Sequence, residues 1–321
     1  MKGLLTVCRK ELSDHFSSTR FLLLFYLILM ISLVIAYVVG MGLRDELQGM
    51  AKPDFVFLML FTSSGKLFSL IQFISFFGPL IGIVLGFDAI SRERSSRTLS
   101  KLVAQPIYRD AIINGKFLAG VITIVIMLVA IVLLISALGL ILVGVVPGPE
   151  EVWRLFIYLV ISIFYISFWL GIAILFSVAF RSTATSALAA IAFWIFFSFF
   201  ISLGASLMAD AAVPIEQNTA QTNPELLVRH EKVRSVITLF SPMTLYSEAT
   251  TTILDPLRKT TSSILLMGPM ERLSISRFQN PLPLAESVYL VFPHLISMIA
   301  ITLVCFAISY IVFMRQEIRS T

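Results

Sequence analysis

Six long runs that lack acidic and basic residues constrain this chain more than any other feature of its sequence. A helix crosses the apolar part of a bilayer with about 20 residues, and one charge at its centre costs roughly 2.5–3.5 kcal/mol. Each run is long enough to cross, and the last one carries an imidazole, His294. The sequence therefore predicts an all-α polytopic membrane protein with six transmembrane helices, over Phe21–Gly42, Leu67–Phe87, Phe117–Val146, Leu155–Phe180, Ser182–Ala209 and Ser287–Met314.

The amount and the placement of charge exclude a soluble or nucleic-acid-binding protein. Charged residues make up 13% of the chain, whereas soluble domains carry about 25%. Four Lys and Arg residues, including Arg154, fall in the short loops 43–66 and 147–154, and thirteen fall in segments 1–20, 88–116, position 181 and 315–321. Because basic residues accumulate in cytoplasmic loops, we expect a multi-pass protein of the cell membrane with both termini in the cytoplasm and no nucleic-acid partner.

The remaining segments predict smaller units around the membrane helices. Within residues 1–20 apolar side chains recur every three or four positions, which favours a helix lying in the membrane interface over a merely solvated tail. Segment 210–286 is too long for a plain connector, and we expect it to form an extracytoplasmic cap. Its moderately apolar part, Val236–Leu254, is broken by Pro242 and is too polar to span. The predicted units are 1–20, 21–209 with a cytoplasmic segment 91–116, 210–286 and 287–321.

The second transmembrane run carries three glycines, Gly78, Gly82 and Gly86, at four-residue spacing. This spacing removes side chains from one helix face and lets another backbone approach closely. Pro79 beside the first glycine predicts a kink. Two interpretations stay open: a helix that flexes during a working cycle, or a static and tightly packed one.

The most informative polar segment lies between the second and third runs. From Ser91 to Lys116 it holds six Lys and Arg residues against two acidic ones, Glu93 and Asp110. Leu99, Leu102 and Val103 form a small apolar patch before Pro106 breaks the segment. An apolar anchor ringed by charges, here including Arg94 and Arg97, is typical of a short helix that docks into a groove of a partner. The accumulation of basic residues in cytoplasmic loops explains the arginines, but it does not explain the leucines and the proline.

These residues resemble the signature of the ABC-2 type permeases, the transmembrane subunits of ATP-binding-cassette transporters. The matching positions are Asp88, Ile90, Glu93, Thr98-Leu99, Pro106, Arg109 and Gly115-Lys116, together with Arg9-Lys10-Glu11-Leu12 ahead of the first membrane helix. The chain departs from the pattern at Arg97, where many relatives have glycine, and we therefore expect a continuous helix there rather than a tight turn. Within the family the resemblance is nearest to NosY-like permeases.

The resemblance implies a permease subunit of an exporter that works as a homodimer, or with a similar subunit, in contact with membrane lipids. A separate ATPase subunit would bind ATP and Mg, since no Gly-x-x-x-x-Gly-Lys-Ser/Thr motif occurs here, and no cofactor is expected in this chain. Segment 91–105 would be the coupling helix. The implied contact residues are Asp88, Glu93, Arg94, Arg97, Thr98, Leu99, Leu102, Pro106 and Arg109, with Arg9, Lys10 and Glu11 in the N-terminal element.

Two other functions are weighed against this one. A NosY-like permease would use the motion to drive an extracytoplasmic partner protein, as in metal-site maturation, and co-purification of such a partner would favour it. An intramembrane enzyme would need a nucleophile with a base, a metal triad or paired carboxylates within the membrane. The helices offer His294, Gln72 and hydroxyls but no such motif, and the two cysteines and three histidines are scattered, so no metal site is predicted.

Overall fold

The computed structural model describes residues 2–47, 55–62, 69–98, 108–213, 224–238, 240–256 and 281–315, and these form helices without strands. Six helical runs are long and apolar enough to cross a membrane, which confirms the six predicted ones. They are α2 (Thr19–Glu46), α4 (Leu70–Gly86), α7 (Arg109–Val143), α8 (Pro149–Ala179), the continuous α9 (Thr183–Ile195), η1 (Phe196–Phe200) and α10 (Ile201–Ala212), and α14 (Leu284–Arg315).

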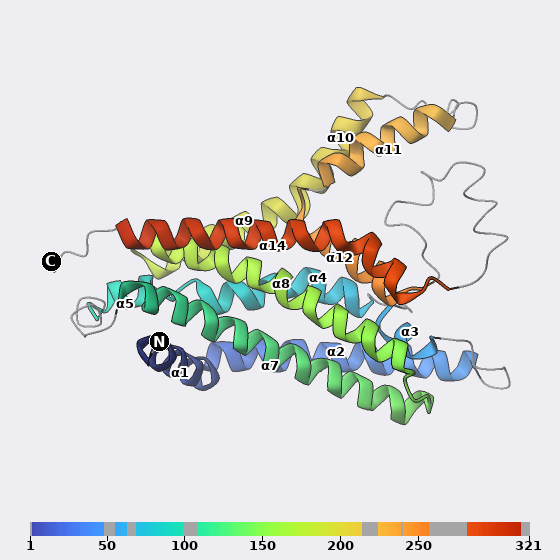
Figure 1. Ribbon diagram of the computed structural model, residues 1–321, viewed down its shortest axis with the longest axis horizontal. Helices are drawn as coiled ribbons and strands as arrows, with labels where there is room; N and C mark the ends of the chain where they lie inside the picture. Colours follow the sequence, from blue (N-terminus) through green and yellow to red (C-terminus); the bar gives the residue numbers. More distant parts are fainter. Residues whose placement is uncertain are drawn as a thin grey trace.

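Shorter helices lie at the two ends of this bundle, except for α11, which projects away from it with α10 (Figure 1). They are α1 (Lys2–Ser17), α3 (Val56–Thr62), α5 (Ser91–Ser95), α11 (Pro224–Thr238) and α12 (Pro242–Leu254). Figure 1 places α1, α5 and the last turn of α14 together at one end, which we call the α5 end. Helices α3 and α12, the turn between α7 and α8, and the first turn of α14 lie at the opposite end, which we call the α3 end.

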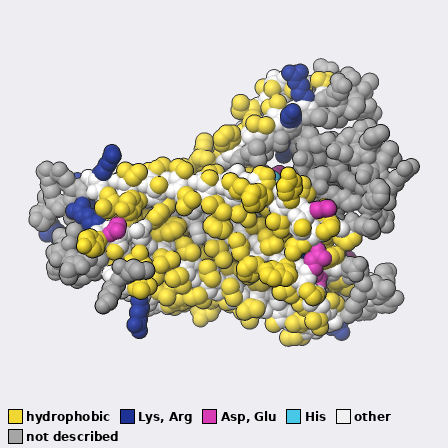
Figure 2. Space-filling view, viewed as in Figure 1, with side chains coloured by type: hydrophobic (Ala, Val, Ile, Leu, Met, Phe, Trp, Pro, Cys, Tyr) yellow, Lys and Arg dark blue, Asp and Glu magenta, His cyan; other side chains and the backbone are white. Residues whose placement is uncertain are grey.

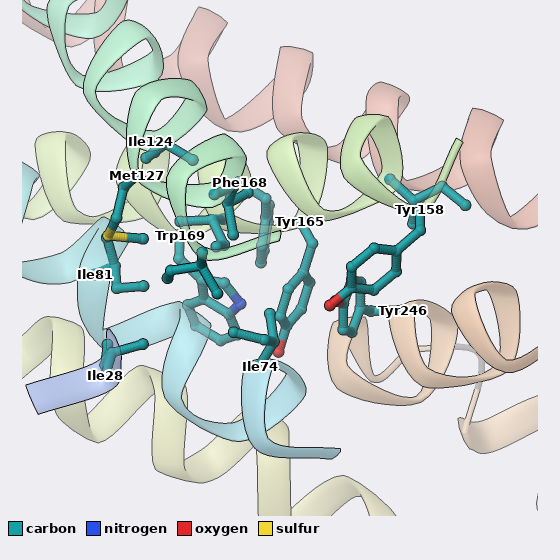
Figure 3. Close-up of a cluster of buried hydrophobic side chains, with 14 of the residues drawn as sticks. Ile28, Ile74, Ile81, Ile124, Met127, Tyr158, Tyr165, Phe168, Trp169 and Tyr246 are labelled. Atoms are coloured by element: carbon teal, nitrogen blue, oxygen red, sulfur yellow. The ribbon is translucent and has the colours of Figure 1, made fainter. Parts of the chain in front are cut away.

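Helix α8 is the centre of the bundle, because it packs against α4, α7, α12 and α14. Its Trp169 and Tyr165 are fully buried, and Tyr165 stacks on Tyr246 of α12 with ring centroids 4.3 Å apart (Figure 3). The hydroxyls of Tyr246 and Ser162 are hydrogen-bonded at 2.9 Å. A hydroxyl buried among apolar side chains needs such a partner, so these pairs fix how α12 lies on α8.

The outer faces of the bundle are also apolar. Figure 2 shows hydrophobic side chains covering the length of the bundle, with Lys, Arg, Asp and Glu gathered towards its ends. Exposed residues include Leu23 and Met30 of α2, Leu188 of α9, and Leu303 and Ile308 of α14. Apolar side chains all round a helix are typical of a membrane-embedded protein.

The fifth membrane run leaves the bundle at a π-helical turn that the sequence analysis does not anticipate. Beyond η1, α10 and α11 form a hairpin that projects away from the other helices (Figure 1). The hydroxyl of Ser241, the N-cap of α12, donates to the carbonyl of Phe197 at 3.2 Å. A π turn disturbs the regular hydrogen bonding of a helix, and this hydroxyl partners a carbonyl inside it. Pro242 stands in the first turn of α12, so the predicted break falls at a helix start.

A fully buried arginine joins α8, α12, α14 and the residues just before α14 at the α3 end. The predicted loop position of Arg154 is wrong, because the residue lies in the second turn of α8. Its guanidinium donates to the carboxylate of Glu150, to the carbonyls of Ile253 and Leu282, and to the hydroxyl of Ser287. Hydropathy alone places a lone arginine next to an apolar run in a loop, whereas a complete set of acceptors allows its burial.

Candidate functional site

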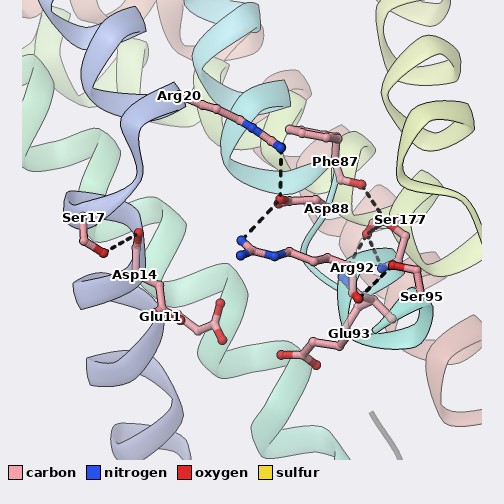
Figure 4. A network of polar contacts seen from close by, with 12 residues as sticks. Glu11, Asp14, Ser17, Arg20, Phe87, Asp88, Arg92, Glu93, Ser95 and Ser177 are labelled. Atoms are coloured by element: carbon pink, nitrogen blue, oxygen red, sulfur yellow. Dashed lines mark hydrogen bonds and ion pairs between the residues drawn. The ribbon is translucent and has the colours of Figure 1, made fainter. Parts of the chain in front are cut away.

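The candidate site is the α5 end, where the chain leaves α4, turns through Phe87–Ile90 and enters α5. The backbone amides of Ile90 and Ser91 donate to the hydroxyl of Ser177 on α8, at 2.9 and 3.0 Å. The hydroxyl of Ser186 on α9 donates to the carbonyl of Phe87 at 2.8 Å. Two neighbouring membrane helices therefore hold the start of α5 in place (Figure 4).

Helix α5 ends at Ser95, followed by a tight turn. Arg97 has a left-handed backbone with φ of 58°. The amide of Thr98 donates to the carbonyl of Glu93 at 2.9 Å, and the amide of Arg97 donates to the carbonyl of Arg94 at 3.2 Å. This is a Schellman motif, which usually places glycine in the left-handed position. The prediction of a continuous helix through Arg97 is wrong, because these two bonds offset the steric cost of the arginine, roughly 1–2 kcal/mol.

Glu93 points inward, to a buried ammonium group. The Nζ atom of Lys116, in α7, lies 2.9 Å from Oε1 of Glu93 and 2.8 Å from Oε1 of Glu11 in α1. The Lys116 side chain is 4% exposed. One lysine therefore joins three helices that are far apart in the sequence.

Asp88 lies between two arginines. Its Oδ2 is 3.8 Å from Nη1 of Arg20, at the start of α2, and 3.9 Å from Nη1 of Arg92 in α5 (Figure 4). Both arginines are mostly exposed, at 72% and 76%, so these pairs are screened by water and contribute little. The ion pairs at this end are formed by four acidic side chains, Glu11, Asp14, Asp88 and Glu93, and four basic ones, Lys10, Arg20, Arg92 and Lys116.

Helix α1 packs closely along α7. A Cβ atom added at Gly115 would lie 2.9 Å from Cγ1 of Val7 and 3.2 Å from the carbonyl oxygen of Leu4. The missing side chain at Gly115 thus lets α1 approach, and the next residue, Lys116, binds it. Burial by itself would raise the pKa of Glu11, but the ammonium groups of Lys116 and Lys10 hold it below its usual value.

Of the N-terminal residues singled out by the sequence, Glu11 reaches across to another helix. Lys10 pairs with Glu11 and Asp14 of its own helix, at 2.9 and 3.0 Å, and Arg9 is exposed. His15 lies one turn after Glu11 in α1, and its burial lowers its pKa. The positive charge of Lys116 lowers this pKa further, while the negative charges of Glu11, Asp88 and Asp14 oppose the decrease.

The other predicted contact residues that the structure describes lie in α5, in the turn after it and at the start of α7. Arg92, Arg97 and Thr98 are exposed, whereas Arg94 is partly buried and its Nη1 donates to the carbonyl of Val178 at 3.3 Å. Arg109 is the first residue of α7. Three predicted contact residues lie outside the described residues, namely Leu99, Leu102 and Pro106.

The three glycines of α4 face α8. A Cβ atom at Gly82 would lie 2.6 Å from the carbonyl oxygen of Ile166 and 2.7 Å from the amide nitrogen of Leu170. At Gly86 it would lie 2.8 Å from Cβ of Ala173, and at Gly78 it would lie 3.2 Å from the Ile166 side chain. The α4 and α8 backbones are therefore in direct contact.

The polar groups within the membrane helices form small, separate clusters. Nε2 of His294 lies 3.5 Å from Oε2 of Glu248 in α12. Within the described ranges no group of three or more His, Cys, Asp or Glu residues is placed to hold a metal ion. The side chain of Gln72 closes the N-terminal capping box of α4.

Two of the residues that fix α5 are not among the contact residues implied by the sequence, although Gly115-Lys116 is a signature position. Lys116 carries a usable signal, because it is the last charge before a thirty-residue apolar run and follows a glycine. Ser177 carries none, since hydroxyls are common in the membrane runs and a tertiary contact selects this one.

A family model described as "ABC-2 family transporter protein" matches residues 5–318. No curated protein matches the chain at the significance required.

Proposed function

Because the chain belongs to the ABC-2 transporter family, in which this subunit spans the membrane and a separate subunit hydrolyses ATP, we propose that the α5 end is the cytoplasmic docking surface for that ATPase. The observation that carries the proposal is the way α5 is held. Ser177 fixes its start and Lys116 fixes its inner face, while Arg92 of α5 and Ser96 and Arg97 of the following turn are exposed. A partner that pushes on such a helix moves the membrane helices with it.

The proposed orientation follows from charge. With the α5 end in the cytoplasm, the inner segments hold thirteen basic residues, whereas segments 43–66 and 147–154 at the outer side hold four, of which Arg154 lies in the second turn of α8. This asymmetry agrees with the positive-inside rule. Both termini are then cytoplasmic, and α1 lies at the inner membrane interface. Leu99, Leu102 and Pro106 follow α5 directly, and we assign them to the contact with the ATPase.

A second copy of the chain completes the permease in this proposal. The most apolar parts of α9–α10 and α14 are the least buried of the six runs, at 18% and 17%. These helices offer apolar surface to a second copy and to lipid. We propose that the complex is an exporter, with ATP and Mg bound by the ATPase subunits.

The projecting α10–α11 hairpin favours a second candidate function, the docking of a partner protein. In a NosY-like permease the hairpin, with the rest of the outer cap 210–286, would dock an extracytoplasmic partner protein. Co-purification of such a partner, without ATP-dependent movement of a small molecule into or out of vesicles, supports this function. ATP-dependent movement of a solute by the permease and its ATPase alone supports transport.

The test of the docking surface replaces its two leucines and leaves the ion pairs of α5 unchanged. The variant Leu99→Ala/Leu102→Ala is expected to bind the ATPase subunit about a hundredfold more weakly, since each leucine buried in a groove contributes roughly 1.5 kcal/mol or more. A matched control, Leu133→Ala/Leu134→Ala, removes two exposed leucines of α7 and is expected to bind normally. The proposal is contradicted if the folded Leu99→Ala/Leu102→Ala variant binds the ATPase subunit and stimulates its hydrolysis as strongly as the parent does.

A further inference from the structure

Lys116 and Arg154 are the buried basic side chains of the part of the chain that the structure describes. Arg154 joins neighbouring helices at the α3 end, whereas Lys116 lies two turns into α7 at the α5 end. Its ammonium contacts a carboxylate of α1 at 2.8 Å and a carboxylate of α5 at 2.9 Å. Helix α1 otherwise packs along α7, and α5 packs against α9. The Lys116 ammonium is thus a shared contact for two helices with different neighbours.

The burial of this cluster makes the two contacts hard to break. Glu11 and Glu93 are 10% and 12% exposed, and Lys116 is 4% exposed. Separating a buried ion from its partner leaves a charge without compensation, which is strongly unfavourable. Gly115 adds a steric fit, because α1 occupies the space of the missing side chain. Displacement of α5 away from α1 therefore has to break a buried contact.

The neighbouring contact between α5 and α2 has the opposite character. Asp88 lies 3.8 Å from the exposed Arg20 and 3.9 Å from the exposed Arg92. Exposed pairs of this length open and re-form at little cost. The contacts through Asp88 are therefore weaker than the buried ones through Lys116.

We propose that Lys116 is a positioning residue that makes α1 and α5 move as one unit, so that α1 becomes a second element through which the ATPase acts on α7. The inference rests on the proposed docking of the ATPase at the α5 end. It extends that function by giving the N-terminal helix a part in transmission rather than only in anchoring.

The test measures the distance between α1 and α5 in the whole complex. Spin labels are placed at Ser13→Cys and Ser96→Cys, both exposed, with Cys8→Ala and Cys305→Ser as background. Permease and ATPase subunits are reconstituted in nanodiscs, and pulsed electron resonance is recorded without nucleotide and with ATP and vanadate. The expected result is one distance distribution that is the same in both states.

Lys116→Met removes the ammonium and keeps an apolar chain. We expect its label distance to broaden and to differ between the two states, with the ATPase still bound and its stimulation reduced about tenfold. Lys10→Met is the matched control, because Lys10 is 54% exposed and pairs within α1; it is expected to behave like the parent. If Lys116→Met does not fold, Glu93→Leu carries the test, since it removes the carboxylate through which α5 contacts Lys116 and leaves Lys116 paired with Glu11.

A parent distance that changes between states overturns the inference, and so does an unchanged distribution in the folded Lys116→Met or Glu93→Leu variant. Failure of the docking proposal is a separate result. The docking proposal fails if Leu99→Ala/Leu102→Ala binds the ATPase subunit as strongly as the parent does, whatever distances the spin labels report.

Discussion

Adding one methyl group to the glycine face of α4 should separate it from α8. At Gly82→Ala the new Cβ meets backbone atoms at 2.6 and 2.7 Å, and these cannot rotate away as a side chain can. The helices must move apart by about 0.8 Å to reach an ordinary contact of 3.4 Å. A gap of that size forfeits a quarter to a half of the dispersion energy along the contact. We expect a loss of about 3 kcal/mol.

The other helical glycines supply a graded series. Gly78→Ala meets a flexible Ile166 side chain at 3.2 Å and is expected to cost about 1 kcal/mol. Gly42→Ala has no atom within 4 Å and is expected to be neutral or to stabilise α2 by up to about 1 kcal/mol.

The assay is the thermal unfolding midpoint of each purified variant in one detergent. Gly82→Ala should lower the midpoint by about 6 °C, Gly78→Ala by much less, and Gly42→Ala not at all. Equal midpoints for Gly82→Ala and Gly42→Ala would refute the direct contact between the α4 and α8 backbones.

Three further predictions concern single residues. Arg154→Met should destabilise the protein by about 2–4 kcal/mol, because it leaves the carbonyls of Ile253 and Leu282 without their donor; thermal unfolding measures this against the exposed Arg44→Met, and equal midpoints would be evidence against it. Arg97→Gly should slow amide hydrogen exchange at Thr98 by up to about tenfold, since glycine adopts the left-handed backbone without steric cost; faster exchange would speak against the tight turn. Because burial lowers the pKa of His15, its neutral form is favoured in the fold, so its contribution to stability is complete above about pH 6.5 and decreases as the pH falls through the lowered value. The protection of the α1 amides, measured as their exchange rate relative to that of the unfolded chain at the same pH, should therefore decrease below about pH 6.5 in the parent and less in His15→Gln, and equal pH profiles of this protection would contradict the prediction.

The membrane helices were predictable because their signal is one of composition. Uncharged runs of about 20 residues have few other uses, and each predicted run coincides with a long helix. Helix α3 was not predicted, because a signal of composition needs a long apolar run and α3 has seven residues. Its Phe57, Leu58 and Phe61 are nevertheless buried.

The contacts of the α5 end depend on tertiary packing, which sequence patterns do not report. The sequence marks Glu93 as a signature residue, yet nothing in it says that the carboxylate turns inward to Lys116. The turn at Arg97 was predicted wrongly because backbone propensity favours a helix there, whereas the capping bonds from Arg97 and Thr98 decide the outcome.

The most direct test of the central claim is a photo-crosslink from α5 to the ATPase subunit. A photoreactive amino acid at Ser96, exposed after α5, is compared with one at Val146, which is 80% exposed at the α3 end. The account predicts that the Ser96 probe captures the ATPase in intact cells and that the Val146 probe does not. Capture from Val146 without capture from Ser96 would contradict it.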